Sequence, residues 1–396
     1  MMRMIRDGPQ SRQDEPLQRT SDSAYSGAIM RGKRRQKIGI LGGGAWGTAI
    51  GKVLAEQGCR VEIWCFEEEV ARAVNREHRN PRYLMGVALP EKLKATSDLM
   101  TAAAKKDYLI IAVPSPYLIG IVRRMLTVPD IIEGRTRIAL ATKGFVEADG
   151  KVKLLTDAVE DYLPGKYKGN LVYLSGPSHA EEVARGKITG LISASASGTT
   201  AIRFRKLFSG TNLIVFSSLD VKGVQISAAV KNVIAIAFGM LDALAELSER
   251  FGDNTEALLL AAGLNEIQRL GLAMGATHAE TFASIAGVGD LEVTCRSRYG
   301  RNRRLGREII LTRLLDRFKD IDDLITHIND LGYLAEGAVA ARYVQILSRE
   351  YGVVLPICRG VYRVLNRKVP PQKVVENILE GIVSSREIAA SYFAAP

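Results

Sequence analysis

The sequence has no long apolar run, and that shortage argues against a membrane protein. No stretch of about 20 uncharged apolar residues occurs, because Lys231 and Asn232 interrupt the apolar residues 226–241. We therefore expect no membrane span. The N-terminal segment MMRMIRDGPQ carries basic side chains but no apolar block follows it, so it does not predict a secretory signal. We expect a cytoplasmic protein.

Cysteine is scarce as well, which argues against a disulfide framework and against a zinc site. The cysteines are Cys59, Cys65, Cys295 and Cys358, and no two of them are spaced as C-x-x-C. None is accompanied by histidines at a spacing typical of zinc ligands. We expect four reduced thiols and no metal.

Length and composition favour a globular protein with two domains. At 396 residues the chain exceeds the size at which one core usually stops growing, and 47% of its residues are hydrophobic.

Part of the net charge of +11 lies in residues 296–307, which hold six arginines. A nucleic-acid-binding protein would interleave aromatics there, and only Tyr299 is present. A local anion site explains the cluster at least as well, so we expect no nucleic acid as a partner.

The apolar pattern changes at residue 37. Residues 1–36 are polar and mixed in charge, which predicts a disordered extension; an early start codon is the plain alternative. From 37 to 220, short β-branched runs alternate with helical segments, which indicates a doubly wound, mostly parallel sheet of the Rossmann type. The expected strands are 37–41, 60–64, 108–113, 136–142, 171–175, 188–194 and 212–217.

A second change follows residue 220, because residues 221–396 show apolar side chains at helical spacing. The predicted fold class is α/β plus all-α, with an N-terminal Rossmann domain and a C-terminal helical substrate domain. The expected helices are 222–246, 254–275, 302–317, 336–350 and 371–384.

A glycine pattern directly follows the first predicted strand. Gly42, Gly44 and Gly47 form G-x-G-x-x-G at the start of a helical segment that runs to about residue 57. In this context the glycines permit a tight turn, a close approach of a pyrophosphate and close packing of helix and strand. The pattern predicts a dinucleotide site at the helix N-terminus.

Two further positions bear on that site. Glu67 lies twenty residues after Gly47 and could bind the adenosine ribose, or it could be a solvated acid of the next helix together with Glu68 and Glu69. Two prolines in residues 113–116 force a sharp turn where the third strand ends, so we expect backbone to flank the cofactor there.

Five segments, taken in order and spacing, carry a resemblance to a known family. They are GGGAWGTAIG (42–51), ATKG (141–144), SGPSHAEE (175–182), VKNVIAIAFG (230–239) and GVGDLEVTCRSRYGRNRRLG (287–306). The chain resembles the bacterial-type NAD(P)-dependent glycerol-3-phosphate dehydrogenases from about residue 37 to 384. The resemblance implies reversible reduction of dihydroxyacetone phosphate to sn-glycerol 3-phosphate with NAD(H) or NADP(H), which supplies glycerophospholipid synthesis.

The resemblance also assigns the catalytic residue. Lys231 lies in an apolar helical segment, where a lysine either reaches the surface or is held against a site. Its family counterpart donates and accepts the proton. Lys143 matches a lysine that contacts substrate and cofactor, and two ammonium groups close together lower each other's pKa. Asp290 matches a substrate-binding position and could orient a lysine; otherwise it caps a helix.

Arg301 and Asn302 match the family's contacts with the substrate phosphate, and Arg301 also matches a cofactor contact. A guanidinium and an amide beside a helix start suit a phosphate dianion. We expect the other arginines of this stretch, Arg303, Arg304 and Arg307, to be solvated or helix-surface charges.

The remaining assignments follow from the same resemblance. Substrate contacts are Gly176, Ser178 and Gly300; cofactor contacts are Ala45, Trp46, Phe66, Ala180, Leu334 and Glu336.

Two departures from the family put cofactor choice and one substrate contact in doubt. The family commonly has serine where this chain has Gly300, so a hydroxyl contact becomes a backbone contact. Phe66 replaces a residue that is often basic near the ribose 2′ position, and with Glu67 it favours NADH at least as much as NADPH.

A related two-domain 3-hydroxyacid-type dehydrogenase is the alternative, since such enzymes share the Rossmann start and a helical second domain. It would need a carboxylate-binding pattern in place of Gly176, Ser178, Arg301 and Asn302, and none is found. We expect a homodimer that binds a small phosphorylated substrate.

Overall fold

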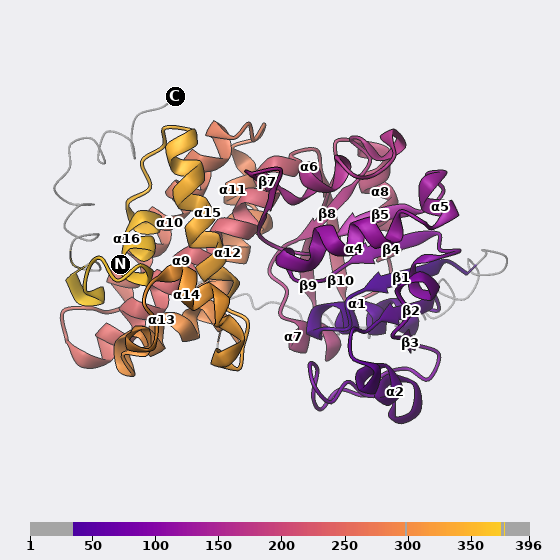
Figure 1. Cartoon of the computed structure of the whole chain (residues 1–396), viewed down its shortest axis with the longest axis horizontal. Coiled ribbons are helices and arrows are strands. Elements are labelled where there is room, and N and C mark those ends of the chain that lie inside the picture. Colours follow the sequence, from indigo (N-terminus) through magenta and orange to yellow (C-terminus); the bar gives the residue numbers. More distant parts are fainter. Residues whose placement is uncertain (1–34, 298, 374–375, 377–396) are drawn as a thin grey trace, which may run out of the picture. The chain divides into compact units, whose positions relative to one another are not determined.

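The computed structural model describes residues 35–297, 299–373 and 376. The predicted extension 1–36 lies almost entirely outside the described residues, as does most of the predicted helix 371–384. The described N-terminal half contains one twisted sheet in the order β10-β9-β8-β5-β4-β1-β2-β3 (Figure 1). Neighbouring strands are parallel except β8 and β9, which are antiparallel. The Rossmann prediction is confirmed.

Every strand expected from the sequence is present, and the structure adds shorter ones. The sheet strands are β1 (Lys37–Leu41), β2 (Arg60–Trp64), β3 (Lys94–Thr96), β4 (Tyr108–Ile111), β5 (Arg137–Leu140), β8 (Val172–Ser175), β9 (Thr189–Ala194) and β10 (Leu213–Ser218). The unpredicted ones are β3 and the separate hairpin of β6 (Phe145–Ala148) and β7 (Lys151–Leu154).

Helices cover both faces of the sheet because strand side chains alternate between two cores. Ile38 and Ile40 pack against one set of helices, whereas Leu109 and Ile111 pack against the other. The first face carries α1 (Ala45–Glu56), α2 (Glu68–Glu77), α7 (Ala180–Ala184) and α8 (Gly198–Leu207). The second carries α3 (Leu99–Ala103), α4 (Leu118–Met125), α5 (Pro129–Ile132) and α6 (Leu155–Glu160), with single turns η2 (Ser115–Tyr117) and η3 (Gly165–Tyr167).

The C-terminal half is helical and is built around α9 (Val221–Leu247). Around it are α10 (Asp253–Ala273), α11 (Glu280–Ala283), α12 (Asp290–Arg296), α13 (Arg301–Leu311), α14 (Ile321–Thr326), α15 (Glu336–Glu350) and α16 (Pro356–Leu365), with the short turns η4 (Ile285–Gly289), η5 (Leu314–Arg317) and η6 (Ile328–Leu331). By length and composition α9 could cross a membrane, but its most apolar stretch is entirely buried in the fold. It is a core helix.

Two glycines let α9 and α13 cross in close contact. A Cβ atom at Gly239 would lie 2.0 Å from the backbone oxygen of Arg303, and one at Gly306 would lie 2.1 Å from that of Ile236. No side chain fits at either position. The crossing therefore brings the first turn of α13 beside the middle of α9, where Lys231 lies.

Arg303 and Arg307 are helix-surface charges, and both pair with Asp242 rather than being freely solvated. Arg303 Nη2 lies 2.6 Å from Asp242 Oδ2, and Arg307 Nη1 lies 2.7 Å from the same oxygen. One carboxylate of α9 thus binds two arginines of α13 and reinforces the crossing. Arg304 is exposed and pairs with Glu308 within its own helix.

The predicted helix 302–317 is also corrected, because α13 ends at Leu311 and Arg313 then adopts a left-handed conformation with φ of 53°. The proposed division at residue 220 stays a prediction; α9 begins at the next residue.

Candidate functional site

The glycine-rich turn has the geometry that a pyrophosphate requires. Gly42 has φ of 127°, and a Cβ atom there would lie 2.7 Å from the backbone oxygen of Ala112 on the neighbouring strand's end. Gly44 is the N-cap of α1, and no described side chain caps the helix or places an acid in its first turn. A Cβ at Gly44 would have no heavy atom within 4 Å, so the space before the helix is open. The positive end of α1 is free to bind an anion.

Asn80 fixes this turn, and the sequence analysis missed it. Its buried side-chain amide donates to the backbone oxygen of Gly43 at 2.8 Å and to Thr48 Oγ1 at 2.9 Å. Its own oxygen accepts the backbone N–H of Tyr83 at 3.0 Å. One buried asparagine therefore holds the dinucleotide turn and the loop at 80–83 together.

Glu67 is held at the end of β2, so the expectation of a simply solvated acid is wrong. Tyr83 donates its hydroxyl to Glu67 Oε1 at 2.5 Å, and Arg82 Nη1 lies 3.4 Å from the same oxygen. Burial, followed by the bond to Glu67, raises the pKa of Tyr83 to about 12. Beside them the ring of Phe66 is 80% exposed. This group lies where the adenosine end of a dinucleotide is expected.

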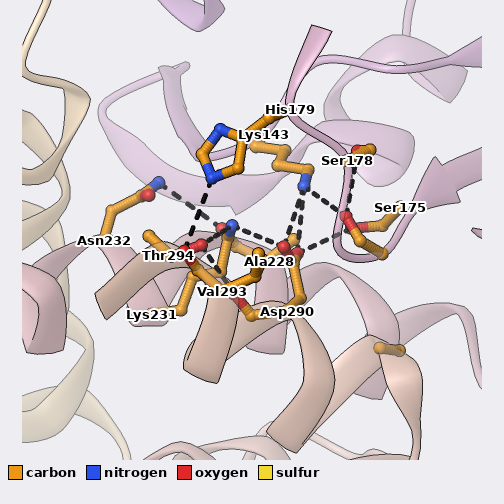
Figure 2. Close-up of polar contacts among 12 residues, drawn as sticks. Lys143, Ser175, Ser178, His179, Ala228, Lys231, Asn232, Asp290, Val293 and Thr294 are labelled. Atoms are coloured by element: carbon orange, nitrogen blue, oxygen red, sulfur yellow. Dashed lines mark hydrogen bonds and ion pairs between the residues drawn. The ribbon is translucent and has the colours of Figure 1, made fainter. Parts of the chain in front are cut away.

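Lys143, Lys231 and Asp290 meet at the carboxyl end of the sheet (Figure 2). Lys231 Nζ lies 2.7 Å from Asp290 Oδ1, and Lys143 Nζ lies 2.9 Å from Asp290 Oδ2. Lys143 extends from the loop after β5, Lys231 from α9, and Asp290 from the first residue of α12. The caps of α12 do not use the Asp290 side chain, so Asp290 orients the lysines rather than capping the helix.

Burial lowers the pKa of Lys231. Only 5% of the residue is exposed, and its pKa is lowered from 10.5 to about 8, mainly because burial penalises the charged amine. Asp290 opposes the shift, and Lys143 adds to it. The expected lowering of the Lys231 pKa by Lys143 is therefore present, and burial lowers it more.

Thr294 contacts the amine of Lys231, Asn232 is hydrogen-bonded to Asn302, and neither was predicted as a site residue. Lys231 donates to Thr294 Oγ1 at 2.6 Å, and Thr294 in turn donates to the backbone oxygen of Asp290 at 2.6 Å. The signal for Thr294 was its position four residues after Asp290, which places both on one face of a helix. Asn232 follows Lys231 directly and was visible only as a polar break in an apolar segment.

The loop at 176–178 joins this group through a backbone oxygen. Gly176 accepts from Lys143 Nζ at 3.0 Å and from Ser178 Oγ at 3.0 Å. Ser175 Oγ lies 3.5 Å from Asp290 Oδ2. The structure thus brings Gly176 against Lys143, with Ser178 bound to the same backbone oxygen.

Arg301 and Asn302 begin α13, but their side chains differ in availability. The side chain of Arg301 is 54% exposed, and its nearest acid, Glu336, lies 4.0 Å away. Asn302 is buried: it donates to Asn232 Oδ1 at 2.9 Å and accepts the backbone N–H of Gly337 at 2.9 Å. The guanidinium is therefore free to turn towards an anion, whereas the amide is already engaged.

The remaining predicted contacts lie at or just before the starts of helices. A Cβ at Gly300 would lie 2.9 Å from the backbone oxygen of Thr294 and 3.1 Å from that of Ser297, so serine would require the chain to shift. Gly300 is the N-cap of α13. Ala180 is the first residue of α7 and Glu336 the first of α15, and Leu334 precedes the latter; Ala45 and Trp46 form the first turn of α1.

Together these features define a nicotinamide-dependent dehydrogenase of carbonyl compounds, with a dinucleotide turn on a Rossmann sheet and a buried lysine bound to Asp290. The family comparison makes this specific. Residues 37–201 match the model of the NAD-dependent glycerol-3-phosphate dehydrogenase N-terminus, and residues 220–376 match that of the C-terminus. The chain belongs to this family.

Named relatives agree over nearly their whole length. The chain is 48% identical to glycerol-3-phosphate dehydrogenase [NAD(P)+] from Treponema denticola, over 87% of the chain and 98% of the relative. It is 50% identical to the Treponema pallidum protein of the same name, over 86% and 99%. The crystal structure of glycerol-3-phosphate dehydrogenase from Coxiella burnetii matches with a TM-score of 0.75 and 33% identity, over 87% and 99%.

Proposed function

We propose that this enzyme reduces dihydroxyacetone phosphate to sn-glycerol 3-phosphate, reversibly, with Lys231 as the proton donor. The observation that carries the role of Lys231 is its buried amine, held by Asp290 and Thr294 with a pKa of about 8. The hydroxyacid alternative is not favoured by the named relatives. The product is a glycerophospholipid precursor, and we place the reaction in the cytoplasm.

The dinucleotide fits the residues at the turn, with the pyrophosphate at the open N-terminus of α1 beside Gly44, Ala45 and Trp46. When bound, the reduced nicotinamide supplies a hydride to the carbonyl carbon. We assign its other contacts to Lys143, Ala180, Arg301, Leu334 and Glu336, as the family resemblance implies. Ala180 starts α7, so its backbone N–H lies at the positive end of that short turn.

Lys231 and Lys143 stabilise the charge that develops on the carbonyl oxygen during reduction. Two ammonium groups beside one carboxylate leave a net positive centre, which suits a growing alkoxide. Lys231 then transfers its proton to that oxygen, because its pKa is the one lowered towards neutrality. Asp290 and Thr294 hold the amine in place during the transfer.

The substrate phosphate is assigned to Arg301 and to the uncapped first turn of α13. The side chain of Asn302 is hydrogen-bonded to Asn232 and to the start of α15, so its role at this site is to hold these segments and not to bind the phosphate. We further propose that NADH is used at least as well as NADPH, because Glu67 would repel a 2′-phosphate. Arg82, 3.4 Å from Glu67, offsets part of that repulsion.

The test is an assay of dihydroxyacetone phosphate reduction with NADH and with NADPH, in which the absorbance of the reduced cofactor reports the rate. Lys231→Met should lower kcat at least about 100-fold while NADH binding, measured by fluorescence, is retained. Lys222→Met is the matched control, since Lys222 lies on the same helix and contacts the backbone of Met274. Near-normal turnover of Lys231→Met would remove this residue from the mechanism.

Two further outcomes bear on the finer proposals. A preference for NADPH of tenfold or more in kcat/KM would show that Glu67 does not face the ribose. Greater activity on a 3-hydroxy acid than on glycerol 3-phosphate would restore the alternative. Light scattering of the purified protein tests the proposed homodimer.

A further inference from the structure

His179 lies inside the site, and the mechanism above does not use it. It follows Ser178 in the loop after β8 and is the N-cap residue of α7, directly before Ala180. Its Nε2 lies 3.4 Å from the backbone oxygen of Val293 on α12. Val293 is adjacent to Thr294, which binds Lys231. The imidazole therefore joins a loop of the Rossmann half to the helix that carries Asp290 and Thr294 (Figure 2).

Burial lowers the pKa of the His179 ring and keeps the ring neutral. The hydrogen bond to the Val293 carbonyl is the main opposing effect on this pKa; Lys231 and Lys143 lower it further, and Glu181 raises it. A neutral ring that donates from Nε2 to a carbonyl has its proton on that nitrogen. The contact with Val293 thus fixes one tautomer and one ring orientation.

A second contact ties the same ring to the turn that leads to the predicted phosphate site. The rings of His179 and Tyr299 have their centroids 5.7 Å apart at an angle of 51°. The Tyr299 hydroxyl lies 3.5 Å from Arg185 Nη1 at the other end of α7. Tyr299 directly precedes Gly300 and Arg301, so α7 is connected to the start of α13 as well as to α12.

We propose that His179 is a positioning residue for the substrate, which holds the loop at 176–178 at a fixed separation from α12 and from the turn before Arg301. The proposal rests on the proposed function, because Gly176 and Ser178 of the loop are expected substrate contacts and Arg301 is assigned to the substrate phosphate. A ligand that touches both ends binds more weakly when it must itself order the loop.

The expected effect is on substrate affinity. Loss of one hydrogen bond of ordinary strength corresponds to roughly 3- to 10-fold in binding. Because no contact of Lys231, Asp290 or the dinucleotide turn involves the imidazole directly, KM for dihydroxyacetone phosphate should rise by more than kcat or NADH affinity falls. A residue that merely supported the fold would change all three together.

The experiment compares His179→Phe with His179→Gln in the full-length protein. Phenylalanine keeps a ring against Tyr299 but removes the donor, whereas the glutamine amide can still reach the Val293 oxygen. We expect His179→Phe to raise KM for dihydroxyacetone phosphate roughly 3- to 10-fold and His179→Gln to stay within about twofold of the parent. The dissociation constant of NADH and the Tm should change little in both. His278→Phe is the matched control on an exposed histidine.

An unchanged KM in His179→Phe overturns the proposal, as do identical effects of phenylalanine and glutamine. Parallel losses of NADH affinity, Tm and kcat would make His179 a structural residue only. If His179→Phe does not fold, His179→Asn replaces it, because the shorter amide does not reach Val293.

A readout without turnover separates this proposal from the proposed function. Amide hydrogen exchange of residues 176–184 should quicken in His179→Phe and not in His179→Gln. Failure of the parent to reduce dihydroxyacetone phosphate would contradict the proposed function, whereas unchanged exchange would contradict the anchoring role of His179 whatever the substrate is.

Discussion

Lys231 combines two tendencies that rarely coexist in one side chain: it is almost fully buried, yet it remains bound to a carboxylate. Burial alone would make the amine neutral and useless as an acid, and Asp290 alone would keep it permanently charged. Their balance gives a pKa of about 8. At neutral pH most of the amine carries its proton, and the proton is not held too tightly to be given up.

This balance predicts opposite pH profiles for the two directions. Reduction requires the protonated amine, so kcat/KM for dihydroxyacetone phosphate should fall as pH rises through about 8. Oxidation of glycerol 3-phosphate requires the neutral amine, so its kcat/KM should rise through the same pH. Asp290→Asn removes the negative charge that stabilises the protonated amine of Lys231, so both pH profiles should shift to lower pH. Profiles that do not move in this variant would assign the titration to another group.

Arg301 gives a prediction about substrate discrimination. Each charge-assisted bond to a phosphate contributes about 1.5–3 kcal/mol, or roughly 10- to 150-fold in binding. Arg301→Ala should raise KM for dihydroxyacetone phosphate by this amount, and kcat should fall too, because the phosphate end helps to position the carbonyl. Lysine should rescue only part of the loss, since a point charge does not reproduce the guanidinium fork.

Unphosphorylated dihydroxyacetone is the control for Arg301. The parent should use it poorly, and Arg301→Ala should hardly change that activity. Equal losses on both substrates would mean that Arg301 serves the cofactor or the fold.

The site residues that could be predicted from sequence were those whose side chains are unusual for the segment in which they lie. Lys231 and Asp290 stood out because charged side chains are conspicuous in apolar or glycine-rich stretches. Thr294 and Asn80 did not, because threonine and asparagine are common in many settings. Their roles arise from contacts with Lys231 and Gly43, which are 63 and 37 residues away in the chain.

Among the elements, the long strands followed from apolar runs, whereas β3 and the β6–β7 hairpin did not. A strand of three residues, Lys94–Thr96, has no periodicity to read, and it exists because it pairs with β2. The helix α12 was hidden for a related reason. It has only 7 residues, about two turns, after glycine-rich residues, and its packing against α9 rather than its propensity stabilises it.

The junction of α10 and α16 yields a prediction on stability. Glu266 of α10 is buried and accepts the backbone N–H groups of Ile357 at 2.5 Å and Cys358 at 3.0 Å, at the start of α16. Burial outweighs these bonds and raises its pKa from 4.5 to about 7. The stabilising contribution of the protonated carboxyl is therefore full below about pH 4.5 and is lost as pH rises through about 7. The loss is on the order of 3 kcal/mol at most.

Glu266→Gln should remove this dependence. The parent should lose several degrees of Tm between about pH 5 and about pH 8, and the variant should lose less, because its amide does not ionise. The variant should also be less stable than the parent at the lower pH, since its amide nitrogen does not accept the second backbone N–H. Glu350→Gln is the matched control, because Glu350, the last residue of α15, is exposed. Parallel Tm curves for parent and Glu266→Gln would contradict the prediction.

For the whole molecule, α9 explains why the sheet and the helices form one catalytic unit. Val224 and Ala228 of its first turns belong to the core on one face of the sheet, whereas residues from Ala229 onward belong to the helical core. Lys231 lies where the two cores meet. The sequence indicated both halves by their different periodicities, but it did not show that one helix would enter both cores, because that depends on packing between distant segments.

The family match and the contacts of β1 predict that residues 1–35 are not needed for folding or catalysis. The family match begins at residue 37, and the Treponema denticola relative is covered over 98% of its length by 87% of this chain. The start of β1 is fixed by later residues: the backbone N–H of Lys37 donates to Asp107 at 2.8 Å, and that of Arg60 donates to the Gln36 oxygen at 2.9 Å. A chain beginning at Gln36 keeps both bonds. Its Tm should stay within about 2 °C of the parent, and its kcat/KM should stay within about twofold.

A chain beginning at Gly43 is the control that should fail to fold, because it lacks β1, which pairs with both β2 and β4. A loss of several degrees in the longer chain would show that the N-terminal residues pack on the fold or on a partner subunit.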